Sequence, residues 1–180
     1  MMLQILIVGI PAFLIFLVAL SLKKGVPCAI FVPTPSKIIT CMLELAGLKP
    51  RETLYDLGCG DGRVILMAAQ NYGANAIGVE VNPILVGYAR LKIRRKKLES
   101  RAKVIQSNFF KVDLRKADVI TLYLSQYAND RLEEKLEKEL KPGARVVSYI
   151  FKMSGWKTSV ENPKNVFLYI IPDAIQKNGG

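Results

Sequence analysis

One short stretch, Asp56-Leu57-Gly58-Cys59-Gly60-Asp61-Gly62, limits the possible folds more than any other part of the sequence. It follows the apolar stretch 53–57, which is typical of a buried strand, and it leads into a predicted helix at 62–71. Glu80 comes about 20 residues later, at the end of a second apolar stretch. A glycine-rich turn between a strand and a helix, with an acidic residue ending the next strand, is typical of nucleotide-type cofactor sites in α/β sheets.

Strands and helices alternate along most of the remaining chain. Ser36 predicts the start of one helix, and Asn82 with Pro83 predicts the N-cap and first residue of another. The predicted helices cover 36–47, 62–71, 82–98 and 130–140, and the predicted strands cover 53–57, 76–79, 103–106, 118–124, 145–151, 156–161 and 165–171. We therefore expect a Rossmann-like, mostly parallel seven-stranded α/β sheet with flanking helices and an antiparallel C-terminal strand.

The N-terminus has a different composition. Residues 1–22 contain no charged side chain, and Lys23 and Lys24 follow them. About 20 apolar residues cross the ~30 Å core of a bilayer. A cleaved signal peptide should begin with positive charge, and a buried core helix would not be apolar on every face. We therefore expect a transmembrane anchor over 1–25, single-pass in the cell membrane, with a second domain over 26–180 in the cytoplasm by the positive-inside tendency.

Composition narrows the partners and the chemistry. Lys and Arg number 26 against 15 Asp and Glu, so the net charge of +11 favours nucleic acid, acidic protein surfaces or anionic lipid. The sequence contains no histidine, which is the commonest general base and metal ligand. Its three cysteines, Cys28, Cys41 and Cys59, lack metal-binding spacing. No metal is therefore expected.

The glycine loop also indicates the kind of cofactor. Dinucleotide sites use Gly-x-Gly-x-x-Gly and rest a pyrophosphate on the helix N-terminus. Here Gly58, Gly60 and Gly62 let the backbone approach a ligand closely, while Asp56 and Asp61 would repel a pyrophosphate. Two carboxylates suit a cofactor that carries a sulfonium and an ammonium and no phosphate. S-adenosyl-L-methionine is such a molecule.

Three residues after the second and third strands complete this prediction. Glu80 is placed to accept hydrogen bonds from both ribose hydroxyls. Asn108 is expected at the adenine edge and Phe109 on the adenine face. The alternatives are a solvated loop carboxylate for Glu80, an ordinary turn residue for Asn108 and a core residue for Phe109.

The loop together with Glu80 resembles the cofactor signature of seven-β-strand, class I methyltransferases. Three further stretches, Phe31-Val32-Pro33-Thr34-Pro35, Asn108-Phe109-Phe110 and Leu136-Glu137-Lys138-Glu139-Leu140-Lys141-Pro142-Gly143, are similar to archaeal broad-specificity protein-lysine methyltransferases. They are also similar to the related mitochondrial lysine methyltransferases, which carry an N-terminal membrane segment. Gly155-Trp156 agrees, and the resemblance covers about residues 30–172. It implies methyl transfer to lysine side chains of proteins.

The resemblance also implies roles for single residues. The segment around Thr34 is expected to close over the methionine end of the cofactor, which makes Thr34 both a cofactor-binding and a catalytic candidate. Asn82 and Leu124 complete the expected cofactor set. Tyr123, after the fourth strand, is the second catalytic candidate and is expected to shape the lysine channel, with a place in the core as the alternative. Phe31 departs from the family, which often has tyrosine there.

Other functions stay open at this point. A small-molecule or lipid methyltransferase fits the apolar N-terminus, and a non-catalytic S-adenosylmethionine-binding subunit fits the loop and Glu80. RNA methylation is less favoured, because the basic cluster 94–97 lacks interleaved aromatic residues, so nucleic acid is not expected as a partner. No Asn-Pro-Pro-Tyr-type sequence follows the fourth strand, which argues against methylation of nucleobases or glutamine.

Overall fold

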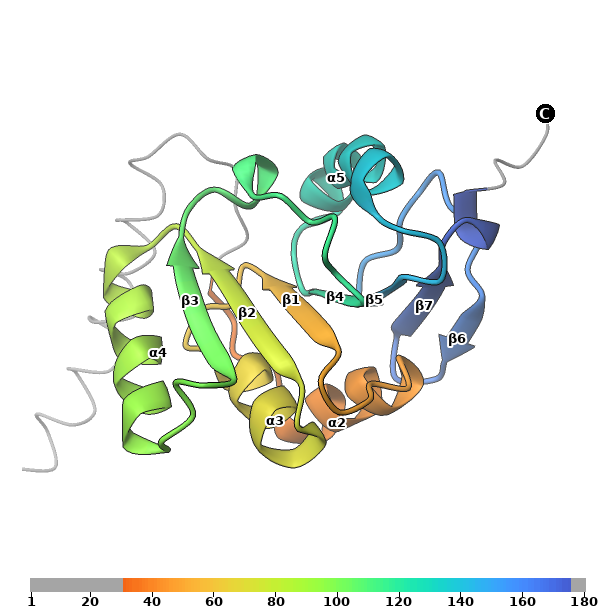
Figure 1. Ribbon diagram of the computed structural model, residues 1–180. Helices are drawn as coiled ribbons and strands as arrows, with labels where there is room; N and C mark the ends of the chain where they lie inside the picture. Colours follow the sequence, from red (N-terminus) through yellow and green to blue (C-terminus); the bar gives the residue numbers. More distant parts are fainter. Residues whose placement is uncertain (1–30, 176–180) are drawn as a thin grey trace, which may run out of the picture. The chain divides into compact units, whose positions relative to one another are not determined.

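A computed structural model describes residues 31–175 of the chain. The chain divides into Met1–Val32 and Pro33–Gly180, and the second of these holds every element described below. Its sheet has seven strands in the order β3-β2-β1-β4-β5-β7-β6 (Figure 1). The strands are β1 (Thr53–Leu57), β2 (Asn75–Glu80), β3 (Ala102–Gln106), β4 (Val119–Leu122), β5 (Arg145–Tyr149), β6 (Val160–Asn162) and β7 (Val166–Ile170).

The direction of the strands agrees with the predicted sheet. Strands β1 to β5 pair in parallel, while β7 pairs antiparallel with β5 and β6 pairs antiparallel with β7. The strand order reverses at β1, which lies between β2 and β4. In open α/β sheets, ligands bind at the carboxyl ends of the strands on either side of such a reversal. The glycine loop follows β1 directly and therefore lies at this point.

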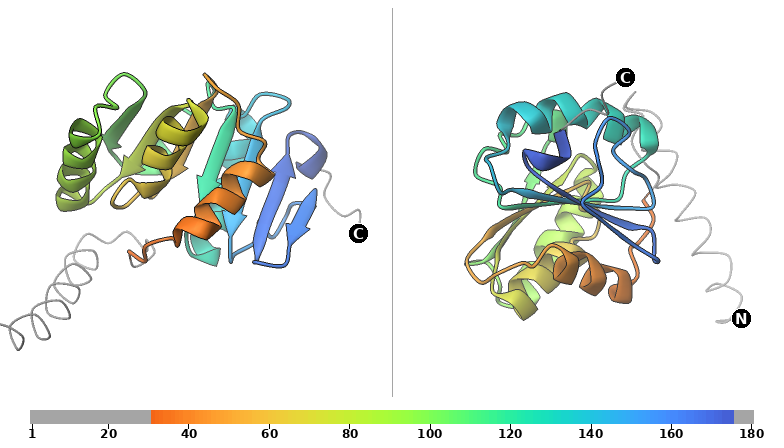
Figure 2. Two further views of the ribbon diagram at one scale, coloured as in Figure 1. Left: turned by 90° about the horizontal axis from the view of Figure 1, so that it is seen from below. Right: turned by 90° about the vertical axis from the view of Figure 1, so that its right-hand side faces the viewer.

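Helices cover both faces of the sheet. Figure 2 shows α2 (Ser36–Leu45), α3 (Arg63–Tyr72) and α4 (Pro83–Arg95) on one face and α5 (Gln126–Glu139) on the other. Two short 3-10 helices, η1 (Phe109–Lys111) and η2 (Asp173–Ile175), lie in the connections. The core includes the fully buried side chains Leu43, Ile65 and Leu54, from α2, α3 and β1. Each such side chain stabilises the fold by roughly 1.5–3 kcal/mol relative to its exposed state.

The ends of two helices show how local chemistry sets their bounds. Asn82 caps α4 as predicted, because its Oδ1 accepts a hydrogen bond from the Ile84 backbone N–H at 3.0 Å. The helix ends at Arg95, before the predicted end at 98, and Lys97 adopts a left-handed φ of 55°. Ser36, predicted to be a cap, is instead the first residue of α2, and Pro35 is at the N-cap without a side-chain bond.

Helix α5 begins four residues earlier than the predicted start at Asp130. Ser125 is its N-cap and accepts a hydrogen bond from the Ala128 backbone N–H at 3.3 Å. The preceding strand, β4, ends at Leu122 and not at Leu124. Leu124 and Ser125 therefore form the connection between β4 and α5, at the carboxyl edge of the sheet.

The predicted fold class also contained an N-terminal transmembrane helix, and this part is corrected. None of the helices within residues 31–175 combines the length and the hydropathy that spanning a bilayer requires. The longest of them, α5, has 14 residues, and the helices cover the sheet with one apolar side. The stretch 1–22 and the predicted domain boundary at residue 25 lie outside the described residues. The boundary and the localisation stay predictions.

Candidate functional site

The candidate site is built around the turn that joins β1 to α3. Gly58, Gly60 and Gly62 adopt left-handed φ angles of 81°, 52° and 78°. The backbone N–H groups of Gly58 and Cys59 donate to the carbonyl of Val79 at 2.8 and 3.0 Å. Because residues other than glycine rarely adopt such angles, these three positions require glycine, and each of them lacks a Cβ atom. The loop is thereby fixed against the end of β2.

Asp56 is a buried carboxyl group near the end of β1. It lies in β1 with a relative exposure of 6%, and its Oδ1 accepts a hydrogen bond from Thr121 Oγ1 of β4 at 2.8 Å. Burial raises the pKa of Asp56 to about 7, the bond from Thr121 opposes this shift, and the charges of Glu80 and Asp61 add to it. A positively charged ligand beside this group would favour its ionised form.

Glu80 ends β2 and organises the loop from the other side. Its Oε2 accepts from the Gly60 backbone N–H at 3.0 Å, and its Oε1 accepts from Val81 and Asn82 at 2.9 and 2.8 Å. An ionised carboxylate has about four acceptor positions. Three of them are thus occupied by the backbone, which leaves room for about one more hydrogen bond where the sequence suggested two.

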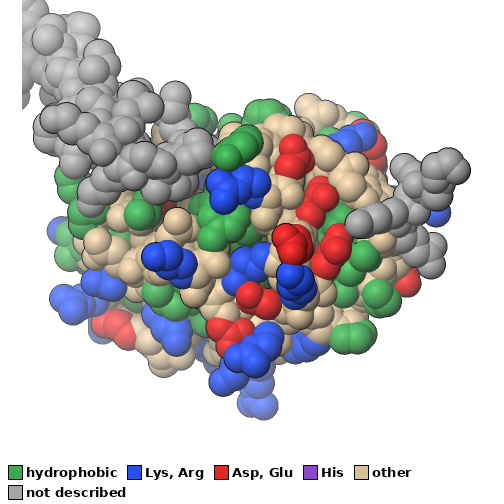
Figure 3. All heavy atoms as spheres, turned by 90° about the horizontal axis from the view of Figure 1, so that it is seen from above, with side chains coloured by type: hydrophobic (Ala, Val, Ile, Leu, Met, Phe, Trp, Pro, Cys, Tyr) green, Lys and Arg blue, Asp and Glu red, His purple; other side chains and the backbone are tan. Residues whose placement is uncertain are grey.

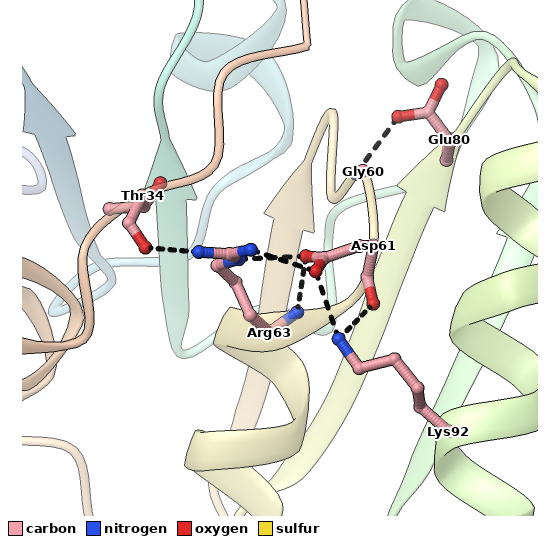
Figure 4. Close-up of polar contacts among 6 residues, drawn as sticks. All are labelled: Thr34, Gly60, Asp61, Arg63, Glu80 and Lys92. Atoms are coloured by element: carbon pink, nitrogen blue, oxygen red, sulfur yellow. Dashed lines mark hydrogen bonds and ion pairs between the residues drawn. The ribbon is translucent and has the colours of Figure 1, made fainter. Parts of the chain in front are cut away.

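Asp61 does not face a ligand as a free carboxylate, which corrects the sequence-based expectation of two such groups in the loop. Arg63 donates to both of its oxygens, and Lys92 Nζ lies 3.0 Å from Oδ2 and 3.0 Å from the Asp61 carbonyl (Figure 4). Burial works against the ionisation of Asp61, but the bonds and charges of Arg63 and Lys92 outweigh it and lower its pKa. Asp56 and Glu80 are therefore the carboxylates at the site.

Arg63 also reaches the segment that precedes α2. Its Nη1 donates to the Thr34 carbonyl at 3.0 Å, so one guanidinium joins the glycine loop to residues 33–35 (Figure 4). Thr34 is buried, with a relative exposure of 7%. The structure thus brings Thr34 to the glycine loop through its backbone, and the predicted catalytic and cofactor-binding role of its side chain stays a prediction.

The other predicted cofactor residues are placed around the loop. The Asn82 side chain is engaged as the cap of α4, and Asn108 Oδ1 likewise accepts from the Phe110 backbone N–H at 3.0 Å. Phe109 is 5% exposed and lies against Phe110, with ring centroids 4.7 Å apart. Asn108 retains its amide N–H groups for a ligand, whereas Phe109 has little free surface. Their predicted contacts with the cofactor stay predictions.

Leu124 and Tyr123 lie at the end of β4. Leu124 is buried and touches the glycine loop, because a Cβ built on Gly58 would lie 2.8 Å from Leu124 Cδ2. Tyr123 is half-buried and packs against Tyr149 of β5, with ring centroids 4.8 Å apart. The predicted alternatives for Tyr123, a lysine channel and the core, are both compatible with this partly exposed place.

Sequence reasoning missed three residues that the geometry makes prominent. Thr121 donates a hydrogen bond to Asp56, and a hydroxyl in an otherwise apolar strand indicates such a buried polar partner. Arg63 and Lys92 neutralise Asp61, but only the Asp-x-Arg spacing of Arg63 was visible in the sequence. Lys92 comes from another helix, so its approach depends on the packing of α4.

The residues at the site fit S-adenosylmethionine. Gly58 has no Cβ, which would otherwise meet Leu124, and two carboxylates, Asp56 and Glu80, flank the turn. Asp56 is buried with Thr121 as its side-chain partner, so it suits a positively charged group, and Glu80 retains an acceptor position for a hydroxyl. Figure 3 shows the molecule from above the view of Figure 1, with hydrophobic side chains at the surface beside side chains of both charges.

Known proteins are similar to this chain in sequence and in fold. The family model described as ANTKMT methyltransferase domain matches residues 56–161. A protein-lysine N-methyltransferase of Saccharolobus islandicus is 44% identical over 142 residues, which are 78% of this chain and 85% of that protein. The adenine nucleotide translocase lysine N-methyltransferase of Mus musculus is 36% identical over 77% of this chain, and the match spans only 63% of that protein.

Solved structures agree with these matches. An RNA methyltransferase from Salinibacter ruber, in complex with S-adenosyl-L-homocysteine, superimposes with a TM-score of 0.77. It is 36% identical, and the match covers 79% of this chain and 95% of that chain. A methyltransferase from Geobacter sulfurreducens in complex with the same compound has a TM-score of 0.58 at 21% identity, which shows the fold alone.

Proposed function

Because the chain belongs to the S-adenosylmethionine-dependent protein-lysine methyltransferase family that carries the ANTKMT methyltransferase domain, we propose that it methylates lysine side chains of substrate proteins. Membership makes the chain a methyltransferase that uses S-adenosylmethionine. The observation that carries the lysine proposal is the 44% identity to an archaeal protein-lysine N-methyltransferase over 85% of that protein. The match spans only 63% of the mouse relative, so the substrate of that protein is not transferred.

The bound cofactor supplies an electrophilic methyl group on a sulfonium. The residues of the chain bind and orient the two reactants, because an in-line displacement requires reacting atoms about 3–3.5 Å apart. The turn at Gly58 and the carboxylates Asp56 and Glu80 would hold the methyl donor, S-adenosylmethionine. Leu124, in the connection after β4, lies beside the turn at Gly58, and we expect the acceptor lysine to bind next to it and Tyr123.

The acceptor must arrive as a neutral amine. A lysine has an ordinary pKa of about 10.4, so most of it is protonated at neutral pH. Surroundings of low polarity favour the neutral form. Leu124 and the half-buried Tyr123 supply such surroundings at the carboxyl end of β4.

The test uses the full-length protein, S-adenosylmethionine labelled in its methyl group, and a mixture of lysine-rich histones. Label recovered as methyl-lysine after acid hydrolysis supports the proposal, and acetylation of the histone lysines beforehand should abolish it. Glu80→Ala should also abolish the label, whereas Glu99→Ala, at an exposed site beyond α4, should not. Label that persists on acetylated histones contradicts lysine methylation.

One observation favours a second substrate class. The Salinibacter ruber structure, 36% identical over 95% of that chain, is of an RNA methyltransferase, and the present chain carries a net charge of +11. The same reaction is therefore run with total RNA in place of histones. Label in RNA and none in histones would replace the lysine proposal by RNA methylation.

A further inference from the structure

Two tyrosines stand side by side where β4 and β5 end. Their strands run parallel, with Leu122 opposite Ser148, so the residues that follow, Tyr123 and Tyr149, are neighbours across the sheet. The ring centroids are 4.8 Å apart and the planes are inclined by 55°. Such tilted pairs are a favourable arrangement of aromatic rings, and both rings remain partly exposed.

The pair lies on the same face of the sheet as the buried carboxyl group of the site. Asp56, Thr121 and Val147 are opposite one another in β1, β4 and β5. Because side chains alternate along a strand, Tyr149 points to the same face as Val147, and both pack against the core on that face. Leu124, next to Tyr123, touches the glycine loop at Gly58. The aromatic pair therefore adjoins the cofactor site.

A strained turn follows Tyr149. Ile150 has a left-handed φ of 70°, and the Phe151 N–H donates to the Tyr149 carbonyl at 3.0 Å, as in a γ-turn. A β-branched residue in this region is a genuine outlier, and such outliers cluster at active sites and ligand clamps. The Ile150 side chain is 40% exposed at the carboxyl edge.

Buried polar groups hold this turn in place. The Phe151 carbonyl accepts from Asn129 Nδ2 at 3.0 Å and from Ser148 Oγ at 2.5 Å. Asn129 and Ser148 are fully buried, and Asn129 Nδ2 also donates to Ser148 Oγ at 3.1 Å. The Ile150 N–H donates to the Asn165 carbonyl at 2.8 Å. The surrounding structure thus fixes the direction of Tyr149 and Ile150 despite the strain.

We infer that Tyr123 and Tyr149 form the wall of the acceptor-lysine site, and that Ile150 is its exposed rim, which contacts the substrate protein. The inference rests on the proposed function. Aromatic faces pack against the methylene stem of a lysine. The surroundings also favour the neutral amine, which gives its proton to water before it attacks the methyl group: burial raises the pKa of Tyr123, with Tyr149 adding to the shift, and burial disfavours a charged ammonium in the same way.

The first test compares two tyrosines that are both partly buried against the same core. Tyr149 lies at the carboxyl edge of the sheet, whereas Tyr72 is the last residue of α3, at the end of that helix away from the glycine loop. Tyr149→Leu should lower kcat/KM for histone lysines by at least about tenfold, with unchanged affinity for S-adenosylhomocysteine. Tyr72→Leu should leave both quantities unchanged within about twofold.

A second variant keeps the test decisive if Tyr149→Leu is unstable. Ile150→Gly relieves the left-handed strain and should melt at the same or a higher temperature, yet it should lower kcat/KM for histone lysines by about fivefold, mainly through KM. Arg51→Gly relieves a similar φ of 69° elsewhere and should not change kcat/KM.

The outcomes separate the two proposals. No lysine methylation by the wild-type protein overturns the proposed function and the inference with it. The inference alone is overturned if the wild type is active and Ile150→Gly keeps its kcat/KM within about twofold, as does Tyr149→Leu where that variant folds. If Tyr149→Leu loses affinity for S-adenosylhomocysteine together with kcat/KM, the Tyr149 ring belongs to the cofactor site, and the inference is overturned.

Discussion

Arg63 holds Asp61 through two parallel hydrogen bonds, from Nε to Oδ1 at 2.9 Å and from Nη2 to Oδ2 at 3.0 Å. The third contact of the same guanidinium is to the Thr34 carbonyl at 3.0 Å. Such planar, bidentate pairs fix geometry as well as charge. Arg63 therefore links residues 33–35 to the glycine loop.

Arg63→Met should raise KM for S-adenosylmethionine by about tenfold and change kcat less, because the segment 33–35 loses its link to the loop. Steady-state kinetics with varied cofactor concentration measure the effect. Arg115→Met is the matched control, because Arg115 makes the same contacts to Asp113 at the same spacing on an exposed surface. An unchanged KM in Arg63→Met contradicts the link.

Much of the fold could be predicted from local patterns. The glycine turn, most of the apolar strands and the Asn82-Pro83 helix start act over a few residues and are found where expected. The strand predicted at 156–161 is an exception, because β6 covers only Val160–Asn162. The start of α5 was misplaced because the cap at Ser125 follows an apolar stretch that also reads as strand. Packing over longer distances decides the place of β7 between β5 and β6, which no local pattern specifies.

The site was predictable to the same extent. Asp56 and Glu80 follow from the motif and its spacing, and both lie at the glycine turn. The ion pair between Asp61 and Lys92 joins residues 31 positions apart, and the contact of Tyr149 with Tyr123 depends on strand register. A single sequence does not encode these contacts in any short pattern, so they required the structure.

Asp56→Asn should stabilise the cofactor-free protein above pH 7 and have little effect near pH 4. The pKa of Asp56 is raised from an ordinary 3.8 to about 7 by burial. Between these values the folded state keeps a proton that the unfolded chain has lost, so the stability that Asp56 contributes falls as pH rises through this window. A shift of this size corresponds to on the order of 4 kcal/mol.

Thermal unfolding at pH 5 and pH 8 checks this prediction, with Asp113→Asn as the control. Arg115 lowers the pKa of the exposed Asp113 through a side-chain hydrogen bond, so this carboxylate stabilises the fold at neutral pH and not in acid. Its replacement should therefore not stabilise the protein at pH 8. An Asp56→Asn variant that is less stable than the wild type at pH 8 contradicts the assignment.

Glu80→Gln should weaken both the fold and the binding of S-adenosylhomocysteine. The amide keeps one acceptor oxygen for three backbone N–H groups, and its own N–H₂ would face a donor. We expect a loss of about 1–3 kcal/mol in the free energy of unfolding and about tenfold in affinity. Chemical denaturation and calorimetric titration measure these quantities, and Glu99→Gln, at an exposed position, should change neither.

Gly58→Ala should be more damaging than Gly143→Ala, although the two glycines have φ angles of 81° and 82°. Both substitutions place a Cβ in the left-handed region, at a cost of about 1–2 kcal/mol. Only at Gly58 does the new atom meet a neighbour, Leu124 Cδ2 at 2.8 Å, whereas nothing lies within 4 Å at Gly143. Overpacking should add about 1–3 kcal/mol at Gly58.

The double variant Gly58→Ala/Leu124→Ala separates strain from contact. Removing the Leu124 side chain relieves the clash, so the added cost of Gly58→Ala in the Leu124→Ala background should fall to that of Gly143→Ala. Denaturation of the single and double variants gives this coupling energy. If this added cost falls and the double variant, unlike Leu124→Ala alone, fails to bind S-adenosylhomocysteine, the Cβ itself occupies the space that the cofactor needs. If the cost falls and the double variant binds as Leu124→Ala does, Leu124 and not the turn sets the limit, and the role assigned to the bare backbone at Gly58 is wrong.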